Sequence, residues 1–196
     1  MASRSDILAA LRRNAPPAVA APELTGLGMT FPDPFAQLAQ AMVAVGGAYV
    51  RVPDIAAAAA AVAALPVAAA AKKVISLVPG VGAPTLELTA IDDPHALADL
   101  DLAILPGALA VAENAAVWVH GSALHHRAVF VITDHLVLVV AAEHVVSDMH
   151  EAYDRLADRP RGHGLFISGP SKTADIEQVL VVGAQGARTC TLVIVG

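Results

Sequence analysis

Charged and aromatic side chains are scarce in this chain of 196 residues, at 15% and 4% of the total. The 18 acidic and 12 basic residues give a formal net charge of −6. This balance argues against nucleic acid as a general partner, because the phosphate backbone is bound by an excess of lysine and arginine. The basic residues in the last quarter of the chain are Arg155, Arg159, Arg161, Lys172 and Arg188. The composition therefore still allows a local pocket for one small anion.

Cysteine occurs once, at Cys190. A single thiol excludes a disulfide framework within the chain, and it excludes an iron–sulfur cluster held by four thiolates of this chain. Cys190 lies in a late apolar run of residues, and this position predicts a buried core residue.

Sequence motifs of common cofactor and metal sites are missing. Neither Gly-x-Ser-x-Gly nor Gly-x-Gly-x-x-Gly occurs. Histidines do gather in one third of the chain, at His120, His125, His126, His135, His144 and His150. Their spacings match no zinc pattern, and no second cysteine assists them. We therefore expect neither a bound metal nor a resident cofactor.

A long hydrophobic segment is also absent, although the mean hydropathy is +0.62. The longest apolar stretch, residues 55–71, is mostly alanine, contains Pro66 and is followed by two lysines. Alanine favours helices but anchors weakly in lipid, so this stretch indicates a packing helix. Residues 1–14 lack the apolar centre of a signal peptide, and we expect a cytoplasmic protein without a membrane span. The high apolar content predicts a surface partly covered by a partner or by another copy of the chain.

Helical and extended patterns alternate along the chain. Helices are predicted over Ser5–Asn14, from Asp33-Pro34 to Gly46-Gly47, and over Asp54–Leu65, Pro94–Leu100, Val145–Ala157 and Thr173–Val182. Strands are predicted over Ala48–Val52, Val74–Val78, Leu102–Leu105, Ala115–His120, Val129–Ile132, Leu136–Ala141, Leu165–Ser168 and Thr189–Val195. Continuous apolar strands between helices indicate an α/β fold with a mostly parallel sheet covered on both faces.

Two further features refine this picture. The three strands in a row in the middle of the chain predict a hairpin, with residues 133–135 as its turn. Residues 14–32 are rich in proline, alanine and glycine, which is typical of a linker. We therefore divide the chain into an N-terminal helix and proline-rich arm, residues 1–32, and an α/β domain, residues 33–196.

Three loops that contain proline and glycine each follow a predicted strand, at residues 78–80, 105–107 and 168–170. If these strands are parallel, the three loops share the carboxyl edge of the sheet, where open α/β sheets bind ligands. A glycine such as Gly107 would let a ligand approach the backbone closely. The alternative is that proline and glycine simply end the strands.

The third loop continues into residues 171–175, where polar side chains crowd before a predicted helix. Ser171 or Thr173 could cap that helix, and Asp175 suits its first turn. Lys172 beside the free amides of the first turn would instead favour a site for a carboxylate or phosphate. The sequence leaves a helix cap, an anion site and a catalytic loop open. The candidate ligand-binding residues are Gly107, Ser168, Gly169, Ser171, Lys172, Thr173, Asp175 and Gln185.

Glu113 and Asn114 interrupt an otherwise apolar run over residues 109–122. A carboxylate in such surroundings is costly unless it is hydrogen-bonded or neutralised. Glu113 is therefore either held by Asn114 and backbone amides, or has a raised pKa suited to acid–base chemistry. A third interpretation is an exposed loop glutamate. We treat Glu113 and Asn114 as candidate catalytic residues.

The stretch "ISGPSKTADIEQVLVVGAQGARTCTLVIV" (residues 167–195) resembles the C-terminal signature of the LUD-domain family, as found in its lactate-utilisation members. The stretch "AVAENAAVWV" (residues 110–119) is similar to the family's Ala-Glu-(Thr/Asn)-Gly motif. Two positions depart from the family pattern. Ala115 stands where the family often has glycine, and Gln185 where many members have histidine.

This resemblance implies a three-layer α/β/α fold like that of sugar-phosphate isomerases and coenzyme A transferases. It also implies a role in bacterial oxidation of L-lactate to pyruvate, beside two iron–sulfur proteins. The single cysteine agrees with that role, because the clusters would then be held by the partner proteins.

Two hypotheses follow from the resemblance and the residues. In the first, the chain is a non-redox accessory subunit of a lactate-oxidising system, and its apolar surface allows a homo-oligomer. Glu113 and residues 168–175 would form a pocket for a small carboxylate or phosphate, with Lys172 pairing with the anion. In the second, the chain is a stand-alone enzyme resembling coenzyme A transferases or acting on a sugar phosphate, with Glu113 as nucleophile or base.

Overall fold

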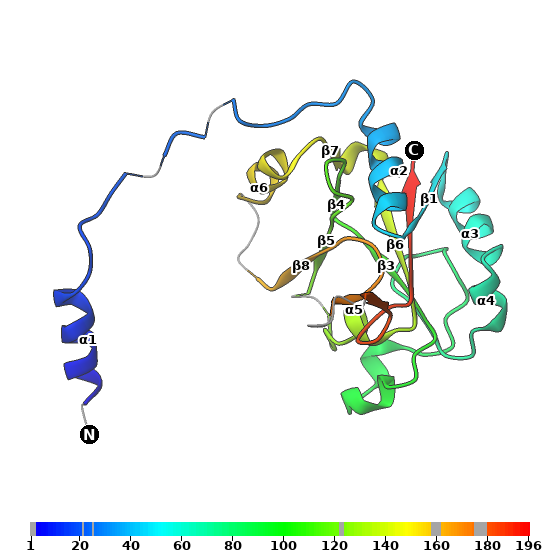
Figure 1. Cartoon of the computed structure of the whole chain (residues 1–196). Helices are drawn as coiled ribbons and strands as arrows, with labels where there is room; N and C mark the ends of the chain where they lie inside the picture. Colours follow the sequence, from blue (N-terminus) through cyan, green and yellow to red (C-terminus); the bar gives the residue numbers. More distant parts are fainter. Residues whose placement is uncertain (1–2, 21, 25, 122–123, 158–161, 175–179) are drawn as a thin grey trace.

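A parallel sheet of five strands forms the centre of the protein, in the order β1-β11-β6-β3-β2 (Figure 1). Its strands are β1 (Ala48–Val52), β2 (Val74–Ser76), β3 (Leu102–Pro106), β6 (His135–Ala141) and β11 (Thr189–Val195). The computed structural model describes residues 3–20, 22–24, 26–121, 124–157, 162–174 and 180–196. The middle strands β6 and β11 are buried from end to end, apart from their outermost residues.

Helices cover both faces of this sheet. Side chains alternate between the faces along each strand, so Leu138 and Val139 of β6 point in opposite directions. Leu138 packs in the same apolar cluster as α2 (Pro34–Ala44), whereas Val139 packs in the cluster of α3 (Ile55–Ala63). The short helix α4 (Pro66–Ala70) lies beside α3. The fold is therefore a three-layer α/β/α arrangement with a mostly parallel sheet, as the sequence predicts.

A second sheet of four strands lies on the α2 side, in the order β7-β4-β5-β8. These strands are β4 (Leu109–Val111), β5 (Val117–His120), β7 (Val145–Val146) and β8 (Gly164–Ile167). One face of the second sheet joins the main core through Ala110 and Val117. The other face is covered by α6 (Met149–Ala157), with Ala152 packed in the same cluster as Leu109.

The remaining elements are short. They comprise α5 (Val129–Ile132), the 3₁₀ turns η1 (Leu88–Ala90), η2 (Pro94–Leu97) and η3 (Ala142–His144), and the strands β9 (Lys172–Ala174) and β10 (Leu180–Val182). At the N-terminus, α1 (Arg4–Arg13) stands apart from the rest of the protein at the end of an extended segment (Figure 1). No helix within the described residues is long and apolar enough to cross a membrane.

The predicted strand over Val129–Ile132 is wrong, because these residues form helix α5. The predicted hairpin around residues 133–135 is also wrong, since β6 pairs in parallel with both β3 and β11. A four-residue apolar run has no periodicity that separates a buried strand from a buried helical turn. Contacts made elsewhere in the chain decide its structure.

The predicted helix over Val145–Ala157 begins too early. Its first two residues form β7, which adds to β4 as a parallel strand. The helix starts only after Asp148, whose carboxylate accepts a hydrogen bond from the amide of Glu151 at 2.9 Å. Tyr153 was expected on the core face, but its side chain is 61% exposed.

The predicted helix over Thr173–Val182 is wrong where it is described. Lys172–Ala174 and Leu180–Val182 are the antiparallel strands β9 and β10, and residues 175–179, including Asp175, lie outside the described residues. The β-branched residues Thr173, Val181 and Val182 suit a strand better than a helix. Among the described residues of this segment, Ser171 and Thr173 therefore cap no helix, and no helix N-terminus is available to bind an anion.

Candidate functional site

A cavity of about 340 Å³ brings together four of the predicted binding residues, Ser168, Gly169, Ser171 and Gln185. Residues 165–171 form one wall and residues 185–187 form another. Apolar side chains of α5 and the start of β6 complete it. Figure 1 shows α5 at the end of the central sheet away from the C-terminus.

The cavity lies at the amino edge of the parallel sheet. Leu136 at the start of β6 lines the cavity, and so does Ala187, which precedes β11. Residues 78–80 follow β2, and residues 105–107 contain the end of β3, at the opposite, carboxyl edge. The predicted meeting of all three loops at one edge is therefore wrong. The third loop follows β8, which belongs to the second sheet, and this placement depends on contacts between distant segments.

Backbone hydrogen bonds hold the two walls of the cavity together. The amide of Ser171 donates to the carbonyl of Ala187 at 2.8 Å, and the amide of Gly183 donates to the carbonyl of Ser171 at 2.9 Å. Gly169 has a φ of +70°, and a Cβ there would lie 2.7 Å from the carbonyl oxygen of Val45. Only glycine fits this turn without a shift of the backbone.

The polar groups of the cavity are neutral donors, since no charged side chain of the described residues lines it. The hydroxyl of Ser171 and the amide side chain of Gln185 are available as donors at its walls. Within the described residues, the backbone amides of Gly169 and Gly186 donate no hydrogen bond. The hydroxyl of Ser168 donates to the carbonyl of Asn114 at 2.7 Å. Such a set of donors suits a small oxygen-rich ligand that keeps an apolar side against α5.

Lys172 does not line the cavity. Its side chain is exposed on β9, and Thr173 beside it is half-buried. The positive charge of Lys172 acts on Cys190, which is buried at the start of β11. Burial raises the pKa of the Cys190 thiol to about 12, and the charge of Lys172 offsets only part of this rise. The thiol therefore stays protonated at neutral pH, as expected for a core residue.

Glu113 points away from the cavity, toward the start of α6. Its Oε2 accepts a hydrogen bond from the amide of Met149 at 3.0 Å, and its own amide donates to the carbonyl of Ser147 at 2.9 Å. Met149 is the first residue of α6, whose amide has no partner within the helix. No ion pair joins Glu113 to Lys172, although both residues are described. Glu113 thus caps a helix, and the shared pocket predicted for it and Lys172 is not formed.

Gly107 is explained by packing between the two sheets. A Cβ at this position would lie 2.5 Å from side-chain carbons of both Val117 and Val140. We expected a ligand to approach the backbone at Gly107, but the side chains of Val117 and Val140 occupy that space.

The LUD domain model matches residues 92–195 of the chain. The chain belongs to the LUD-domain family. The matched LUD domain contains every residue that lines the cavity. A solved crystal structure of a DUF162 family protein from Deinococcus radiodurans is similar at a TM-score of 0.57 and 19% sequence identity, covering 86% of this chain and 100% of the other. At this identity the likeness shows the fold alone. No curated protein matches the chain.

Ala115 of the LUD domain has a φ of +56° and is fully buried. The left-handed region is costly for residues with a Cβ, which explains why glycine suits this motif position. The turn is held by Asn114, whose Oδ1 accepts a hydrogen bond from the amide of Ala116 at 3.0 Å. Alanine in place of glycine at position 115 therefore strains the backbone, and the Ala115 side chain does not line the cavity.

The sequence reasoning missed Gly186, Ala187 and helix α5 as parts of the cavity. The Gly-Ala-Gln-Gly run over residues 183–186 was a usable signal, because paired glycines before a strand indicate a tight loop. No comparable signal marked α5. No group of three metal-binding side chains able to hold a metal ion occurs among the described residues.

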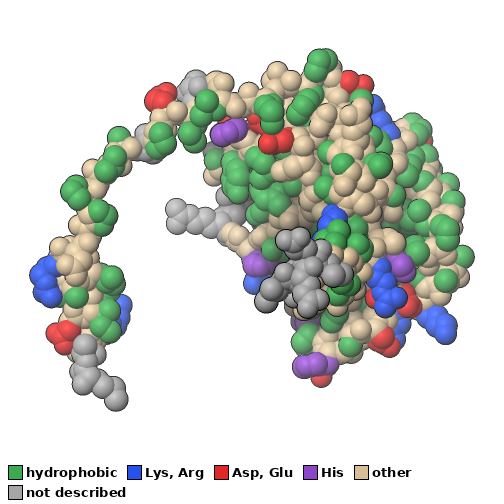
Figure 2. Space-filling view, viewed as in Figure 1, with side chains coloured by type: hydrophobic (Ala, Val, Ile, Leu, Met, Phe, Trp, Pro, Cys, Tyr) green, Lys and Arg blue, Asp and Glu red, His purple; other side chains and the backbone are tan. Residues whose placement is uncertain are grey.

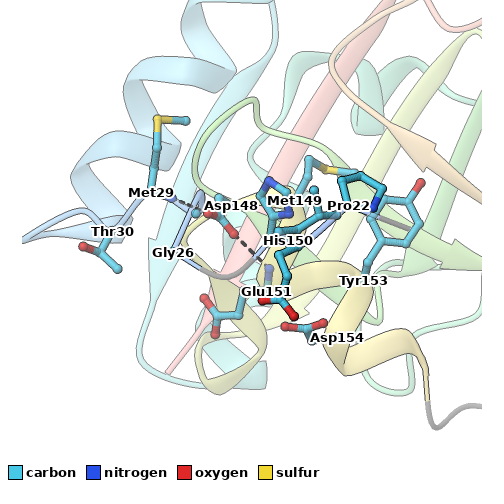
Figure 3. Close-up of a pocket in the computed structure, with 13 residues that line it drawn as sticks. Pro22, Gly26, Met29, Thr30, Asp148, Met149, His150, Glu151, Tyr153 and Asp154 are labelled. Atoms are coloured by element: carbon cyan, nitrogen blue, oxygen red, sulfur yellow. Dashed lines mark hydrogen bonds between the residues drawn. The ribbon is translucent and has the colours of Figure 1, made fainter. Parts of the chain in front are cut away.

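A second, larger hollow of about 1100 Å³ lies between residues 22–24 and 26–30 on one side and helix α6 on the other (Figure 3). The Asp148 carboxylate, 4% exposed, joins its two sides by accepting hydrogen bonds from the amides of Met29 and Glu151. These bonds lower the pKa of Asp148, with the bond from Glu151 as the largest cause. We call this hollow the arm groove. One of its walls lies before the matched LUD domain.

Proposed function

We propose that this LUD-domain protein is a non-redox component of a bacterial system that oxidises L-lactate to pyruvate in the cytoplasm, together with iron–sulfur proteins. The observation that carries the proposal is the position of the C-terminal motif. Ser168, Gly169, Ser171 and Gln185 all belong to the stretch that resembles the family signature, and all four line one cavity. The motif thus coincides with the place on this domain where a small ligand could be bound.

The chemistry of the cavity supports a small carboxylate. The Ser171 hydroxyl, the backbone amides of Gly169 and Gly186 and the Gln185 side chain can donate to carboxylate and hydroxyl oxygens. Apolar side chains such as Phe130 and Leu136 can contact a methyl group on the other side. A 2-hydroxy or 2-oxo carboxylate carries both kinds of group. Neutral donors would hold it with moderate affinity, because charge-assisted bonds from an arginine or lysine are absent from the described lining.

The partner proteins would supply the redox chemistry. The chain has one cysteine, and it is buried as a protonated thiol. Iron–sulfur clusters need several thiolates, so the ligands of any cluster would come from the partners. The position of Glu113 offers no support for the stand-alone enzyme. Its carboxylate is engaged with the amide of Met149, outside the cavity.

Growth on L-lactate tests the proposed role. The gene is deleted in the source bacterium and restored as the wild type, as the double variant Ser171→Ala/Gln185→Ala, or as Gln40→Ala. Gln40 is an exposed glutamine of α2 and serves as the control. We expect deletion to abolish growth on L-lactate, and the wild type and the control to restore it. We expect the double variant to restore growth poorly, because it lacks two polar side chains that line the cavity. Neither of these side chains makes a hydrogen bond to another described residue, so their removal should not disturb the fold.

Unimpaired growth of the deletion strain, with no second copy of the gene, would contradict the role in lactate oxidation. Full rescue by the double variant would leave that role intact and contradict the use of this cavity. Titration calorimetry of the purified protein with L-lactate and pyruvate separates binding from assembly. Heat of binding in the wild type, lost in the double variant and kept in Gln40→Ala, is the expected result.

A further inference from the structure

Helix α1 carries an apolar stripe that touches nothing else in the described structure. Ile7 is 53% and Leu11 62% exposed, and no residue of α1 is buried. Helices of about ten residues are marginal in water by themselves, even with good caps. Ser3 and Asp6 form a capping box at its start. A well-capped helix with an unpaired apolar stripe is suited to packing against another surface.

The charges of α1 are distributed around this stripe. At 100° per residue, Arg4 falls beside the stripe formed by Ile7 and Leu11, whereas Arg12 and Asp6 lie about 120° from it on either side and Arg13 lies on the far side. The face that bears Ile7 and Leu11 is therefore apolar and carries the positive charge of Arg4. Figure 2 shows hydrophobic and basic side chains together on this separate helix. A complementary surface should be apolar in part and acidic.

The arm groove has this composition. Its lining includes the carboxylates of Glu23, Asp148, Glu151 and Asp154 and no lysine or arginine among the described residues. Asp148 is buried, and Glu151 is paired with Arg155 at 2.8 Å, so Asp154 is the exposed carboxylate of α6 best placed to meet a basic side chain. Large apolar side chains are exposed beside them, with Leu24 at 55%, Met29 at 47% and Tyr153 at 61%. Figure 3 shows Glu151, Tyr153 and Asp154 along one stretch of α6. The volume of the groove, about 1100 Å³, leaves room for side chains of another segment between residues 22–24 and 26–30 on one side and α6 on the other.

We propose that the arm groove binds helix α1 of a second copy of this chain, so that two copies exchange their N-terminal helices. The link between α1 and the groove contains Pro16 and Pro17, which favour extended backbone and disfavour a tight reversal. Residues 15–20 are exposed and extended in the structure. A stiff, extended arm carries α1 away from its own groove and toward that of a neighbour. Exchange in both directions produces a two-fold symmetric dimer.

Sedimentation equilibrium of the full chain tests the dimer. We expect the wild type to be dimeric at micromolar concentration and Leu11→Asp to raise the dissociation constant at least tenfold, because one buried leucine is lost at each interface. The matched control is Ala9→Asp, which places the same carboxylate on the far side of α1. We expect the control to stay within about twofold of the wild type, since it does not face the groove. A wild-type monomer at all concentrations, or equal effects of both variants, would overturn the proposal.

Cross-linking between different copies identifies the contact. Leu8→Cys and Tyr153→Cys are made in separate chains, mixed and treated with a short bis-maleimide. The native Cys190 does not compete, because it is buried and its thiol stays protonated. We expect covalent heterodimers from the mixture and none when Tyr153→Cys is replaced by Ala70→Cys on the far side of the central sheet. If a chain that carries both cysteines cross-links only internally, the helix returns to its own groove and the exchange is refuted.

Discussion

At the scale of single residues, two buried or half-buried positions explain features of the motif over residues 110–119. Ala115 is the only residue other than glycine with a positive φ among the described residues. Glu113 supplies its carboxylate to the start of α6. Both residues therefore shape the link between β4 and β5 and its contact with α6. Their roles can be tested by stability measurements, independently of any ligand.

Ala115→Gly is expected to change the free energy of unfolding by less than about 1 kcal/mol. Relief of the left-handed backbone, about 1–2 kcal/mol, is offset by the lost methyl burial and the greater freedom of glycine when unfolded. Ala115→Val should instead destabilise the protein by more than about 2 kcal/mol, because a β-branched side chain fits the left-handed region poorly. Urea denaturation measures both. Similar stabilities for Val and Gly at this position would contradict the assigned backbone conformation.

Glu113→Ala is expected to lower the free energy of unfolding by about 1 kcal/mol, the usual value of a helix cap. Glu113→Gln should cost less, because its side-chain oxygen can still accept the hydrogen bond from the amide of Met149. Thermal and urea denaturation measure the difference between the two variants. If Glu113 had no structural role, both Glu113→Ala and Glu113→Gln would leave the free energy of unfolding unchanged.

At the scale of elements, α6 is the helix whose start is most densely supported. Glu113, Asp148 and Glu151 each accept a hydrogen bond from a backbone amide at or just before its first turn. Negative side chains also complement the positive end of the helix dipole. This concentration of acceptors explains why the helix begins at Met149 and not at Val145, and why Val145–Val146 is free to pair with β4.

Acid is expected to weaken this part of the protein through Asp148. Its folded-state pKa is lowered by hydrogen bonds from the amides of Glu151 and Met29, so it binds protons more weakly when folded than when unfolded. The resulting stability is fully present above the ordinary pKa of aspartate and is lost as the pH falls through the folded-state value. Asp148→Asn should therefore be less stable near neutral pH and show a shallower loss of stability below about pH 4. Urea denaturation between neutral pH and about pH 3 measures the free energy of unfolding of both proteins. The same dependence on pH in the wild type and in Asp148→Asn would contradict the prediction.

At the scale of the whole molecule, the two hollows are lined by different parts of the chain. The cavity between residues 165–171 and 185–187 lies within the matched LUD domain. The arm groove combines α6 with a segment that precedes that domain. A ligand site and an interface for a second copy can therefore coexist without sharing lining residues.

The sequence predicted the central sheet well. Ala48–Val52, Leu102–Leu105, Leu136–Ala141 and Thr189–Val195 were predicted as strands, and all four are strands in the structure. These strands are mostly buried on both faces, so their continuous apolar runs identify them without further information. Asp33 and Asp54 likewise marked the starts of α2 and α3, because each caps the helix that follows it.

The candidate site was predicted only in part. Ser168, Gly169, Ser171 and Gln185 meet at one cavity, whereas Gly107, Lys172 and Glu113 do not line it. The polar residues could be found because they interrupt apolar sequence. The directions in which their side chains point could not be predicted. The sequence around a carboxylate such as Glu113 is the same whether the carboxylate caps a helix or binds a ligand.

The sequence by itself determined the α/β class, the parallel central strands, the capped helices α1, α2 and α3, and the buried Cys190, since each depends on local pattern or composition. Only the tertiary structure decided the second sheet, the helical state of Val129–Ile132 and the strands on either side of residues 175–179. The reason is physical. Short apolar segments have weak intrinsic preferences, so their structure is set by the partners that bury them. The same contacts placed the 168–171 loop at the amino edge of the central sheet, and with it the cavity.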